Sequence, residues 1–589
     1  MRSKDVLIMK SKFAFYFSFI LLVTLALFSC DHEEKPKAAQ TAQGGVEYGG
    51  IFRVNEVGDV RSLYPLNITE VAGYRIANQV YEGLVKYDQA TLQPKPALAE
   101  SWETNEDATE WTFHLRQDVS FHDDPCFEDG VGRNLVAEDV EWCIKQLCTP
   151  NSNNSMFWIA ADRIKGARAF SESQKTDSPL EKIEGVELID DHTIKITLNF
   201  PSAGFLNILG HNGFYVFPKE AQEYYAQDFS THAVGTGPFR VKAFKPNEIA
   251  VLERNPNYYQ MDQFGNQLPY LDAIEVSFVK DKKSELLKFK KGELDMIFTL
   301  PIEMYSDVMS DLSEARNGAN VNFRPQVIPS LSVHFYAFQH QNEVFSDLKV
   351  RKAFNMAIDR ESLVNYTLQG EGTPALYGFV PPAFTGYDYQ QIKGFKFDAI
   401  KARELLAEAG FPSGEGFPEL TLEISSGGSN YELIAQVIQN MLQENLNIKI
   451  NIEVLPMGQQ LDNAEDGKAA FWRDGWVADY PDPENFLCYF VGSDLPDSNH
   501  GRTYMNSGRY QNPTYDSLYL LAIKELDLEN RQKLYRKLDQ LLINDAVIMP
   551  IYYDEFTRLI PVYVQNFPQN SIEYRDFSAV WFKSALREN

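Results

Sequence analysis

The sequence contains few of the residues from which metal centres are built. Only 5 cysteines and 9 histidines occur among its 589 residues, and neither type shows the spacing of a zinc site. The densest group of candidate ligands is His122, Asp123 and Asp124, which we interpret as a solvated loop. We therefore predict no metal and no cofactor.

Common enzyme signatures are also missing. The chain has no Gly-x-Ser-x-Gly nucleophile elbow, no His-Glu-x-x-His zinc helix, no phosphate-binding loop and no Gly-x-Gly-x-x-Gly dinucleotide fingerprint. We predict that no residue is catalytic. A secreted hydrolase whose site lacks these signatures is an alternative to a non-enzymatic function. Product formation from a peptide pool would support it.

Positive charge is scarce relative to negative charge. The chain has 55 Lys and Arg against 82 Asp and Glu, a formal net charge of -27, so a nucleic acid or an anionic membrane surface would be repelled. Aromatic residues are abundant at 13%. They fit either a large core or a ring-lined pocket, and composition does not separate the two.

Only one long apolar run is present, and it stands at the N-terminus. An uncharged stretch, Phe13 to Phe28, follows several basic residues and is short for a membrane-spanning helix, which is typical of a signal peptide over residues 1–29. It ends in Leu27-Phe28-Ser29-Cys30, which resembles a bacterial lipobox and makes Cys30 the expected lipidated residue. An unprocessed signal anchor is the alternative.

Residues 30–45 lack apolar periodicity and indicate a tether, so we expect a cell-envelope protein, periplasmic or otherwise extracytoplasmic, held to the membrane through its lipid. In an oxidising compartment Cys126 could form a disulfide with Cys143 or Cys148. Buried thiols explain these cysteines and Cys488 equally well.

The remaining pattern is that of a mixed α/β protein. Trp111 to Leu115 alternates as a half-buried strand does, and residues 186–198 read as a hairpin. Helices are predicted from Asp398 to Gly410 and from Tyr431 to Asn445, the second leading into an alternating strand. Two apolar segments flanked by proline, 321–338 and 547–553, are candidate crossings between lobes, and the turn at 234–239 is a candidate connection.

The segment from Gly475 to Pro483 places one carboxylate, Asp479, between aromatic residues and ends in two prolines. A buried carboxylate is costly unless a cation or hydrogen-bond donors meet it. A ligand ammonium would meet it. Taken alone, the segment also fits an Asp479 that caps a turn or pairs with an internal arginine.

Several segments, in order and over nearly the whole mature chain, resemble the extracytoplasmic solute-binding proteins of peptide ABC importers, the oligopeptide- and dipeptide-binding family. Besides the Asp479 segment they are Tyr81 to Val85, Pro96 to Trp102, Trp111 to Arg116, Ala137 to Val140, Val234 to Phe239, Arg254 to Tyr259, Pro269 to Asp272, Gly292 to Asp295 and Val350 to Arg360. The stretch from Phe121 to Gly130 is longer than the family pattern.

The resemblance implies an α/β fold, a two-lobed periplasmic-binding-protein clamp (type II, cluster C) with an extra inserted domain. Lobe I would comprise residues 46–81, 233–322 and 549–589, the inserted domain residues 82–232, and lobe II residues 323–548. Such a clamp closes around its ligand by hinge motion.

The resemblance also implies a site. The ligand's α-ammonium would pair with Asp479, and Gly475, Trp476, Val477 and Tyr480 would belong to the same wall, with the peptide backbone pairing as an added strand. By analogous alignment Glu70 and Val71 would supply the facing edge. No residue can be assigned to the peptide's C-terminus, and Asp482 has no assigned role.

The expected partners are a peptide, the permease subunits of an importer and the membrane that holds the lipid on Cys30, and we expect a monomer. Two further alternatives remain. The same fold could bind a non-peptide ligand such as a metal chelate, haem or a sugar, or the tethered protein could bind another protein without transport.

Overall fold

The computed structural model describes residues 40–202, 204–300, 304, 308, 310, 323–384, 386–426, 430–496 and 501–587. The predicted signal peptide and Cys30 lie outside the described residues. Within those described, no helix is both long and apolar enough to cross a membrane. The last residues of the predicted tether are ordered at the edge of lobe I, where β1 (Gln40–Thr41) pairs with β2 (Glu47–Tyr48).

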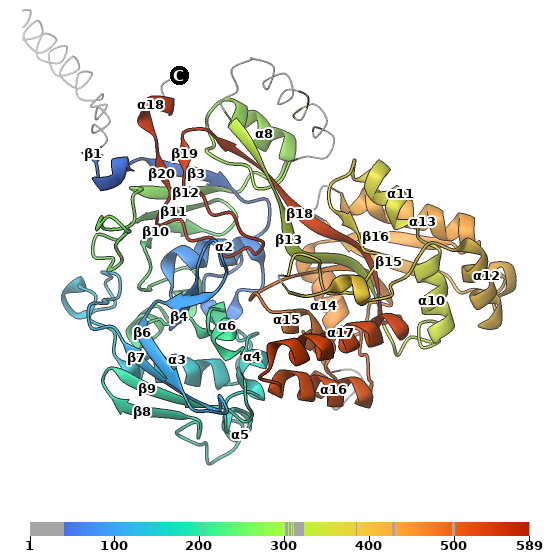
Figure 1. The fold of residues 1–589 in the computed structure, drawn as a ribbon, viewed down its shortest axis with the longest axis horizontal. Coiled ribbons are helices and arrows are strands. Elements are labelled where there is room, and N and C mark those ends of the chain that lie inside the picture. The colour runs from blue at the N-terminus through green and yellow to red at the C-terminus, as the bar shows by residue number, and fades with distance from the viewer. Residues whose placement is uncertain are drawn as a thin grey trace, which may run out of the picture.

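Two lobes lie side by side in Figure 1, and two long strands in the middle of the view join them. Lobe I contains a sheet of order β10-β11-β12-β3, in which β12 and β3 are parallel and the other pairs antiparallel. Its elements are β3 (Ile51–Asn55), α2 (Val71–Val80), β10 (Phe239–Lys245), β11 (Ile249–Arg254), β12 (Ala273–Ser277), α8 (Lys282–Lys290), β19 (Val564–Gln565), β20 (Trp581–Phe582) and α18 (Ser584–Arg587).

The region between α2 and β10 forms a body of its own below lobe I in the view of Figure 1. It holds a short hairpin and an antiparallel sheet of order β6-β7-β9-β8, covered by helices. The elements are β4 (Val85–Tyr87), β5 (Pro94–Pro96), β6 (Ala99–Thr104), β7 (Glu110–Leu115), α3 (Ala137–Cys148), α4 (Trp158–Ala161), α5 (Ala167–Ser173), β8 (Val186–Asp190), β9 (Thr193–Thr197), α6 (Phe205–Leu209) and α7 (Lys219–Tyr225).

Lobe II is built on a mixed sheet of order β14-β18-β13-β17-β15-β16. Its strands are β13 (Phe323–Phe338), β14 (Thr373–Pro374), β15 (Leu420–Ser425), β16 (Ile450–Leu455), β17 (Phe471–Val477) and β18 (Ile548–Pro561). Its helices are α10 (Leu348–Met356), α11 (Arg360–Ser362), α12 (Ala399–Glu408), α13 (Tyr431–Leu446), α14 (Met457–Glu465), α15 (Glu484–Leu487), α16 (Pro513–Lys524) and α17 (Leu528–Asn544).

The strand and helix predictions are confirmed where periodicity was clear. The alternating strand is β7, the hairpin is β8 with β9, and the two helices are α12 and α13, the latter leading into β16. Local chemistry sets the ends of α12, because the Asp398 side chain accepts a hydrogen bond from Lys401 N at 2.9 Å and Gly410 follows with φ +99°.

The two candidate crossings are long antiparallel strands, β13 and β18. They pair with each other from Phe323↔Pro561 to Ala337↔Ile548, and the pairing is irregular between Pro329 and Val333. One half of the pair lies against lobe I, where Leu559 bridges to Ile297, and the other half belongs to the lobe II sheet. The structure therefore joins the lobes through this ribbon.

The loop containing His122 is a correction to the sequence analysis. His122 is 3% exposed and its Nε2 lies 2.9 Å from the carbonyl oxygen of Gly237, so the prediction of a solvated loop was wrong at this residue. Burial lowers the pKa of His122 to about 4, which keeps the ring neutral. The polar residues next to His122 in the sequence suggested exposure, whereas the His122 ring binds the turn that leads into β10.

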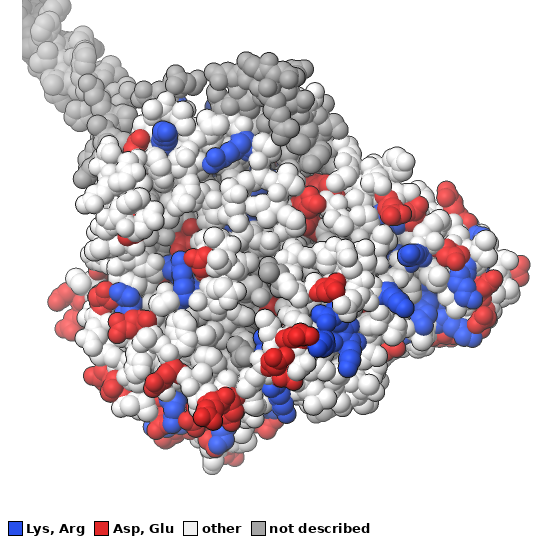
Figure 2. All heavy atoms as spheres, in the orientation of Figure 1, with Lys and Arg blue, Asp and Glu red and all other residues white. Residues whose placement is uncertain are grey.

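None of the described cysteines forms a disulfide: Cys143, Cys148 and Cys488 are buried, and Cys126 is partly exposed. Burial raises the pKa of the Cys148 thiol to about 12. Figure 2 shows acidic and basic side chains interspersed over one face of the molecule.

Candidate functional site

A cavity of about 1080 Å³ lies where the three parts of the molecule meet. The start of α2 contributes from lobe I, the segment before α4 and His211 contribute from the inserted domain, and β13, α14 and β17 contribute from lobe II. Of the residues predicted from sequence, those that line it are Glu70, Val71, Gly475, Trp476, Val477 and Asp479. Residues about 400 positions apart in the sequence, such as Glu70 and Asp479, therefore line the same cavity.

One buried amide holds the Asp479 loop in place. Asn485, which is 0% exposed on α15, accepts hydrogen bonds through Oδ1 from Asp479 N at 2.9 Å and from Trp476 Nε1 at 3.1 Å. Its Nδ2 donates to Asp479 Oδ2 at 3.2 Å. Sequence reasoning missed Asn485, although an asparagine directly before the apolar run from Phe486 to Val491 was a usable signal.

Asp479 has no cationic side chain as a partner. About a third of its side chain is exposed, and its closest basic group among the described residues is His211, whose Nε2 lies 3.9 Å from Oδ1. Burial and Arg163 lower the pKa of His211 to about 3, so this ring is neutral. Gly213 N donates to His211 Nδ1, which leaves the ring hydrogen on Nε2, the nitrogen nearest Asp479.

Burial therefore dominates the electrostatics of this carboxyl and raises the pKa of Asp479 to about 7, while the Asn485 hydrogen bond lowers it. Neither of the two structural roles considered for Asp479 fits. No ion pair in the described chain joins Asp479 to an arginine, and its side chain accepts a hydrogen bond from the Asn485 side-chain amide rather than from a backbone N–H of a turn. The carboxyl can accept a cation that carries its own hydrogen-bond donors.

A cation, Arg473, lies on β17, the strand that precedes Asp479 in the chain. The Arg473 guanidinium lies 3.6 Å from the centroid of the Tyr431 ring, and its Nη2 lies 2.6 Å from His334 Nδ1. His334 Nε2 in turn lies 3.2 Å from Asp554 Oδ2. No salt bridge between described residues includes Arg473, so the cavity holds a positive group without a carboxylate partner. Sequence reasoning did not select Arg473.

Between these two charges, part of β17 has an unpaired edge. Its residues from Phe471 to Val477 pair with β13, whereas β15 pairs only with Phe471 and Trp472 within the described chain. Gly475 N bonds to the Asp474 side chain at 2.8 Å instead of to a strand. An extended backbone can add to such an edge.

Gly475 also keeps the floor of the cavity open. A Cβ on this residue would lie 3.2 Å from Arg473 Nη2 and 3.4 Å from His334 Nδ1. Across the cavity, Glu70 pairs with Arg61 and directly precedes α2, which begins at Val71.

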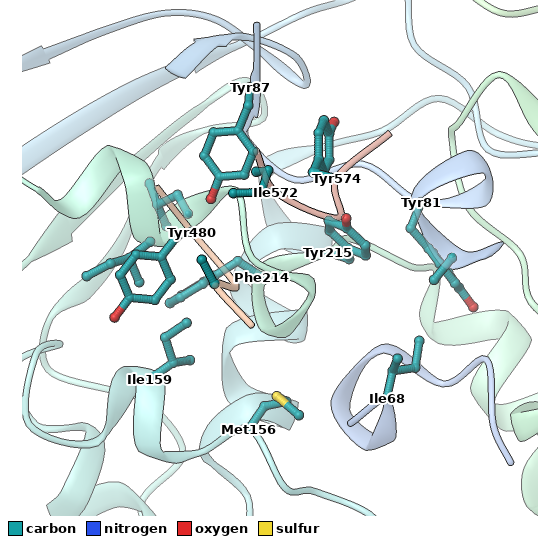
Figure 3. Close-up of a cluster of buried hydrophobic side chains, with 14 of the residues drawn as sticks. Ile68, Tyr81, Tyr87, Met156, Ile159, Phe214, Tyr215, Tyr480, Ile572 and Tyr574 are labelled. Carbon is teal, nitrogen blue, oxygen red and sulfur yellow. The ribbon is translucent and has the colours of Figure 1, made fainter. Parts of the chain in front are cut away.

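Tyr480 is the predicted site residue that the structure does not bring to the cavity. It is fully buried, and its hydroxyl donates to Glu484 Oε2 at 2.6 Å. Figure 3 shows Tyr480 in a cluster of buried hydrophobic side chains with Ile159 and Phe214 of the inserted domain. Glu484 Oε1 also forms a 2.7 Å ion pair with Arg163, so the rear of the loop is fastened to the inserted domain.

Asp482, left without a role by the sequence, accepts a hydrogen bond from Glu484 N at 2.9 Å and so holds the start of α15. Burial raises the pKa of Asp482 to about 6.

The chain is similar to proteins of one family. The family model described as bacterial extracellular solute-binding proteins, family 5 Middle, matches residues 93–496. The periplasmic oligopeptide-binding protein OppA of Salmonella typhimurium is 29% identical over 524 residues, which cover 87% of this chain and 89% of OppA. Heme-binding protein A of Haemophilus influenzae is 28% identical over 565 residues, covering 95% and 97%.

Solved structures share the fold. The periplasmic oligopeptide-binding protein OppAIV of Borrelia burgdorferi superposes with a TM-score of 0.78 at 26% identity, covering 90% of this chain and 100% of that one. DppA of Helicobacter pylori, in complex with the peptide STSA, gives a TM-score of 0.78 at 24% identity, covering 91% and 98%.

Proposed function

This chain belongs to family 5 of the bacterial extracellular solute-binding proteins, and from that membership we propose that it captures peptides in the cavity between its lobes and delivers them to an ABC importer. The observation that carries the proposal is Asp479, a carboxyl at the cavity wall with no internal cation. Relatives whose names state peptide binding, such as OppA of Salmonella typhimurium, support it.

In the proposed complex the α-ammonium of the peptide binds Asp479. An ammonium group supplies the charge and the donors that the carboxyl lacks inside the protein, and a site shielded from bulk water strengthens that pairing. The peptide backbone adds to the open edge of β17 near Gly475. Side chains of the peptide then point alternately to the two sides, which leaves sequence choice broad.

The guanidinium of Arg473, which has no carboxylate partner among the described residues, is the proposed partner of the peptide's terminal carboxylate. Arg473 and Asp479 are six positions apart, which corresponds to about 20 Å at most along an extended chain. Allowing for the reach of both side chains, peptides of roughly three to five residues would connect the two charges. Trp476 and Val477 would lie along such a ligand, and Glu70 and Val71 would close the opposite side.

Closure is proposed to follow from contacts on both lobes. A ligand held by Asp479 of lobe II and by the start of α2 of lobe I favours the closed state, because only that state satisfies both sets of contacts. We propose the segment boundaries predicted from sequence for the lobes, except that the first half of β18 belongs to the lobe II sheet, and we take β13 and β18 as the axis.

Calorimetry and native mass spectrometry test the proposal on the purified mature protein. Co-purified material should include short peptides, and a tetrapeptide with two free termini should bind more tightly than its N-acetyl form or its C-terminal amide. Equal binding of all three forms, or no binding to a mixed peptide pool, would exclude the proposal.

A haem-type ligand is the second candidate, because a heme-binding relative matches the chain over 95% of its length at 28% identity. The same mass spectra distinguish the two, since haem has a fixed mass and a Soret absorption band.

We further propose a lipid anchor on Cys30 after removal of residues 1–29, a monomer and an extracytoplasmic location. Cys30→Ser should abolish membrane association and the diacylglycerol mass on the mature N-terminus. An unchanged membrane fraction would instead support an uncleaved signal anchor.

A further inference from the structure

A group of buried polar side chains lies along the ribbon that joins the lobes, and it reaches the main cavity at Ser332 and Glu573, whereas Gln326 and Arg558 do not line that cavity. Polar atoms without a hydrogen-bond partner in the described chain occur on Gln326, Ser330 and Ser332 of β13 and on Thr557 and Arg558 of β18. Each of these side chains is at most 6% exposed. Such a concentration is unusual, because nearly all buried polar groups in proteins have partners.

Arg558 is the extreme case. Its side chain is 0% exposed, and none of its three guanidinium nitrogens has a hydrogen-bond acceptor among the described residues. The ring of Phe556 lies 4.1 Å away on one side and that of Phe298 6.0 Å away. Aromatic rings therefore flank the guanidinium, while its N–H groups, which point outward in its plane, still need acceptors.

The nearest carboxylate does not meet this need. Glu573 Oε2 lies 3.6 Å from Arg558 Nη2, beyond hydrogen-bond distance, and it already accepts a hydrogen bond from Arg75 Nε at 2.9 Å. Arg75 also pairs with Glu56 at 2.8 Å. Glu573 is thus committed to a different arginine.

Three guanidinium groups lie around two carboxylates here, and a third carboxylate, Asp554, also acts on Arg558. The guanidinium groups of Arg75, Arg558 and Arg575 share the carboxylates of Glu56 and Glu573. The Arg558 and Arg575 guanidinium groups lie 4.1 and 5.1 Å from the same Phe556 ring. Burial and the proximity of Arg558 lower the pKa of Arg575, as expected for two buried cations close together.

Gln326 stands directly opposite Arg558 in the β13–β18 register, so the two side chains share one face of the ribbon. Both polar atoms of the Gln326 amide lack a partner in the described chain. Its NH₂ group is a second donor at the same place. Two donor side chains without acceptors at one place, one of them cationic, fit a small anionic group and not a cation.

We propose that Arg558 and Gln326 bind a monovalent anion of the chloride or carboxylate class, buried against the ribbon between the lobes. The anion satisfies the guanidinium edge. Because β13 and β18 pair with each other between the two lobes, the bound anion stabilises the ribbon that joins them. This inference does not depend on the identity of the ligand in the main cavity.

Thermal unfolding of the mature protein tests the site. The protein is dialysed into sodium isethionate, whose bulky sulfonate is neither a halide nor a carboxylate, and isethionate is then replaced by chloride at constant ionic strength up to about 0.2 M. The expected result is a saturable increase of Tm by about 2 to 4 °C. Arg558→Gln should abolish this response. Arg240→Gln, which removes a partly exposed arginine paired with Glu253, should retain it.

A crystal soaked in bromide provides a second measurement that does not require a variant to fold. An anomalous peak within hydrogen-bond distance of the Arg558 guanidinium and the Gln326 amide supports the proposal. Absence of that peak together with equal Tm values in chloride and isethionate overturns it, and water molecules then satisfy these donors.

The source of the anion is decided by competition. If chloride weakens the binding of a free-acid peptide but not of its C-terminal amide, the anion is the carboxylate of a ligand that reaches the ribbon. If chloride leaves both affinities unchanged while raising Tm, the anion is the free ion. An unchanged chloride response of Tm in Arg558→Gln overturns the proposed position in either case.

Discussion

Two partly buried aspartates, Asp479 and Asp576, show how differently the molecule treats the same side chain. Asp576 forms a 2.9 Å ion pair with Lys86 and accepts a hydrogen bond from Ser578 N at 2.9 Å. Burial alone would raise the pKa of Asp576, but these partners hold that pKa at about 2. Asp479 has only an amide and a neutral imidazole, and burial raises its pKa to about 7.

The difference separates a structural carboxylate from one held ready for a ligand. In lobe I the partner of Asp576 is built into the chain, so the pair is complete in the folded protein. At Asp479 the partner must come from outside, and the protein supplies only what fixes the position of the carboxyl. Removing the partner of Asp576 should therefore lower the stability of the fold, whereas removing the charge of Asp479 should lower the affinity for the ligand.

The largest effect is expected from Lys86→Met. Lys86 is 4% exposed, and its removal leaves Asp576, and Glu82 at 3.9 Å, without their cation. Removing one member of a buried ion pair costs about 3–5 kcal/mol of unfolding free energy. Urea unfolding would measure the loss, and peptide affinity of the folded fraction should stay unchanged.

The matched control is Lys95→Met. Its ammonium lies 3.9 Å from Asp88 and both side chains are about 40% exposed, so the expected loss is about 0–1 kcal/mol. Similar losses for the two lysines would mean that burial does not distinguish these pairs.

Asp479→Asn should act in the opposite way. The substitution keeps the shape and the bond to Asn485 but removes the charge, and loss of one partner of a buried charge pair costs about 2–5 kcal/mol of binding free energy. Affinity for a peptide with a free amine should fall by about 30-fold or more, while Tm stays equal or increases. Titration calorimetry measures the affinity.

Asp482→Asn is the comparison for that substitution, because the asparagine oxygen can still accept the hydrogen bond from Glu484 N. Its affinity should match that of the parent protein. If Asp479→Asn binds free-amine peptides as tightly as the parent, Asp479 does not hold the ammonium.

The pH dependence of binding is the next effect in size. With its pKa near 7, Asp479 is about nine-tenths protonated at pH 6, and it must ionise to bind an ammonium. The α-amine of the peptide has a pKa of about 7.7–8.0 and is itself partly deprotonated at pH 8, so affinity should decrease about fourfold from pH 8 to pH 6. Calorimetry in buffers of different ionisation enthalpy should show release of nearly one proton per peptide at pH 6, and none in Asp479→Asn.

The same pKa predicts a trend in the ligand-free protein. Because the folded-state pKa lies above the unfolded value of about 3.9, the folded state binds the proton more tightly, and this residue lowers stability as pH increases from about 4 to 7. The Tm difference between Asp479→Asn and the parent should grow over that range. A constant difference would contradict the raised pKa.

Sequence patterns predicted the parts of the fold that are set locally. Ala402 and Leu406 of α12 are buried as their spacing required, and the strand that became β7 alternates between core and surface. Those signals lie within one turn or a few residues of strand. The candidate crossings became β13 and β18 for the same reason, since both are apolar, extended and bounded by proline.

The contacts that position the site lie between distant segments, and these escaped the sequence. Arg473 has meaning only beside Tyr431 and His334, and no pattern within its own strand reports them. Arg558 gave a signal that was not used: an arginine within an apolar strand must bury its charge. Polar residues inside apolar runs are therefore candidates for functional roles, as the segment from Gly475 to Pro483 is.

Tyr480 provides the smallest and most discriminating test of the comparison. It adjoins Asp479 in sequence and was assigned to the ligand wall, yet its hydroxyl faces away, onto Glu484. Tyr480→Phe removes one hydrogen bond to a buried carboxylate that keeps Arg163 and Tyr519 as partners. The expected loss of stability is therefore only about 1–2 kcal/mol, measured by urea unfolding, with peptide affinity nearly unchanged. A large loss of affinity with unchanged stability would return Tyr480 to the ligand wall and would mean that the loop turns over when the clamp closes.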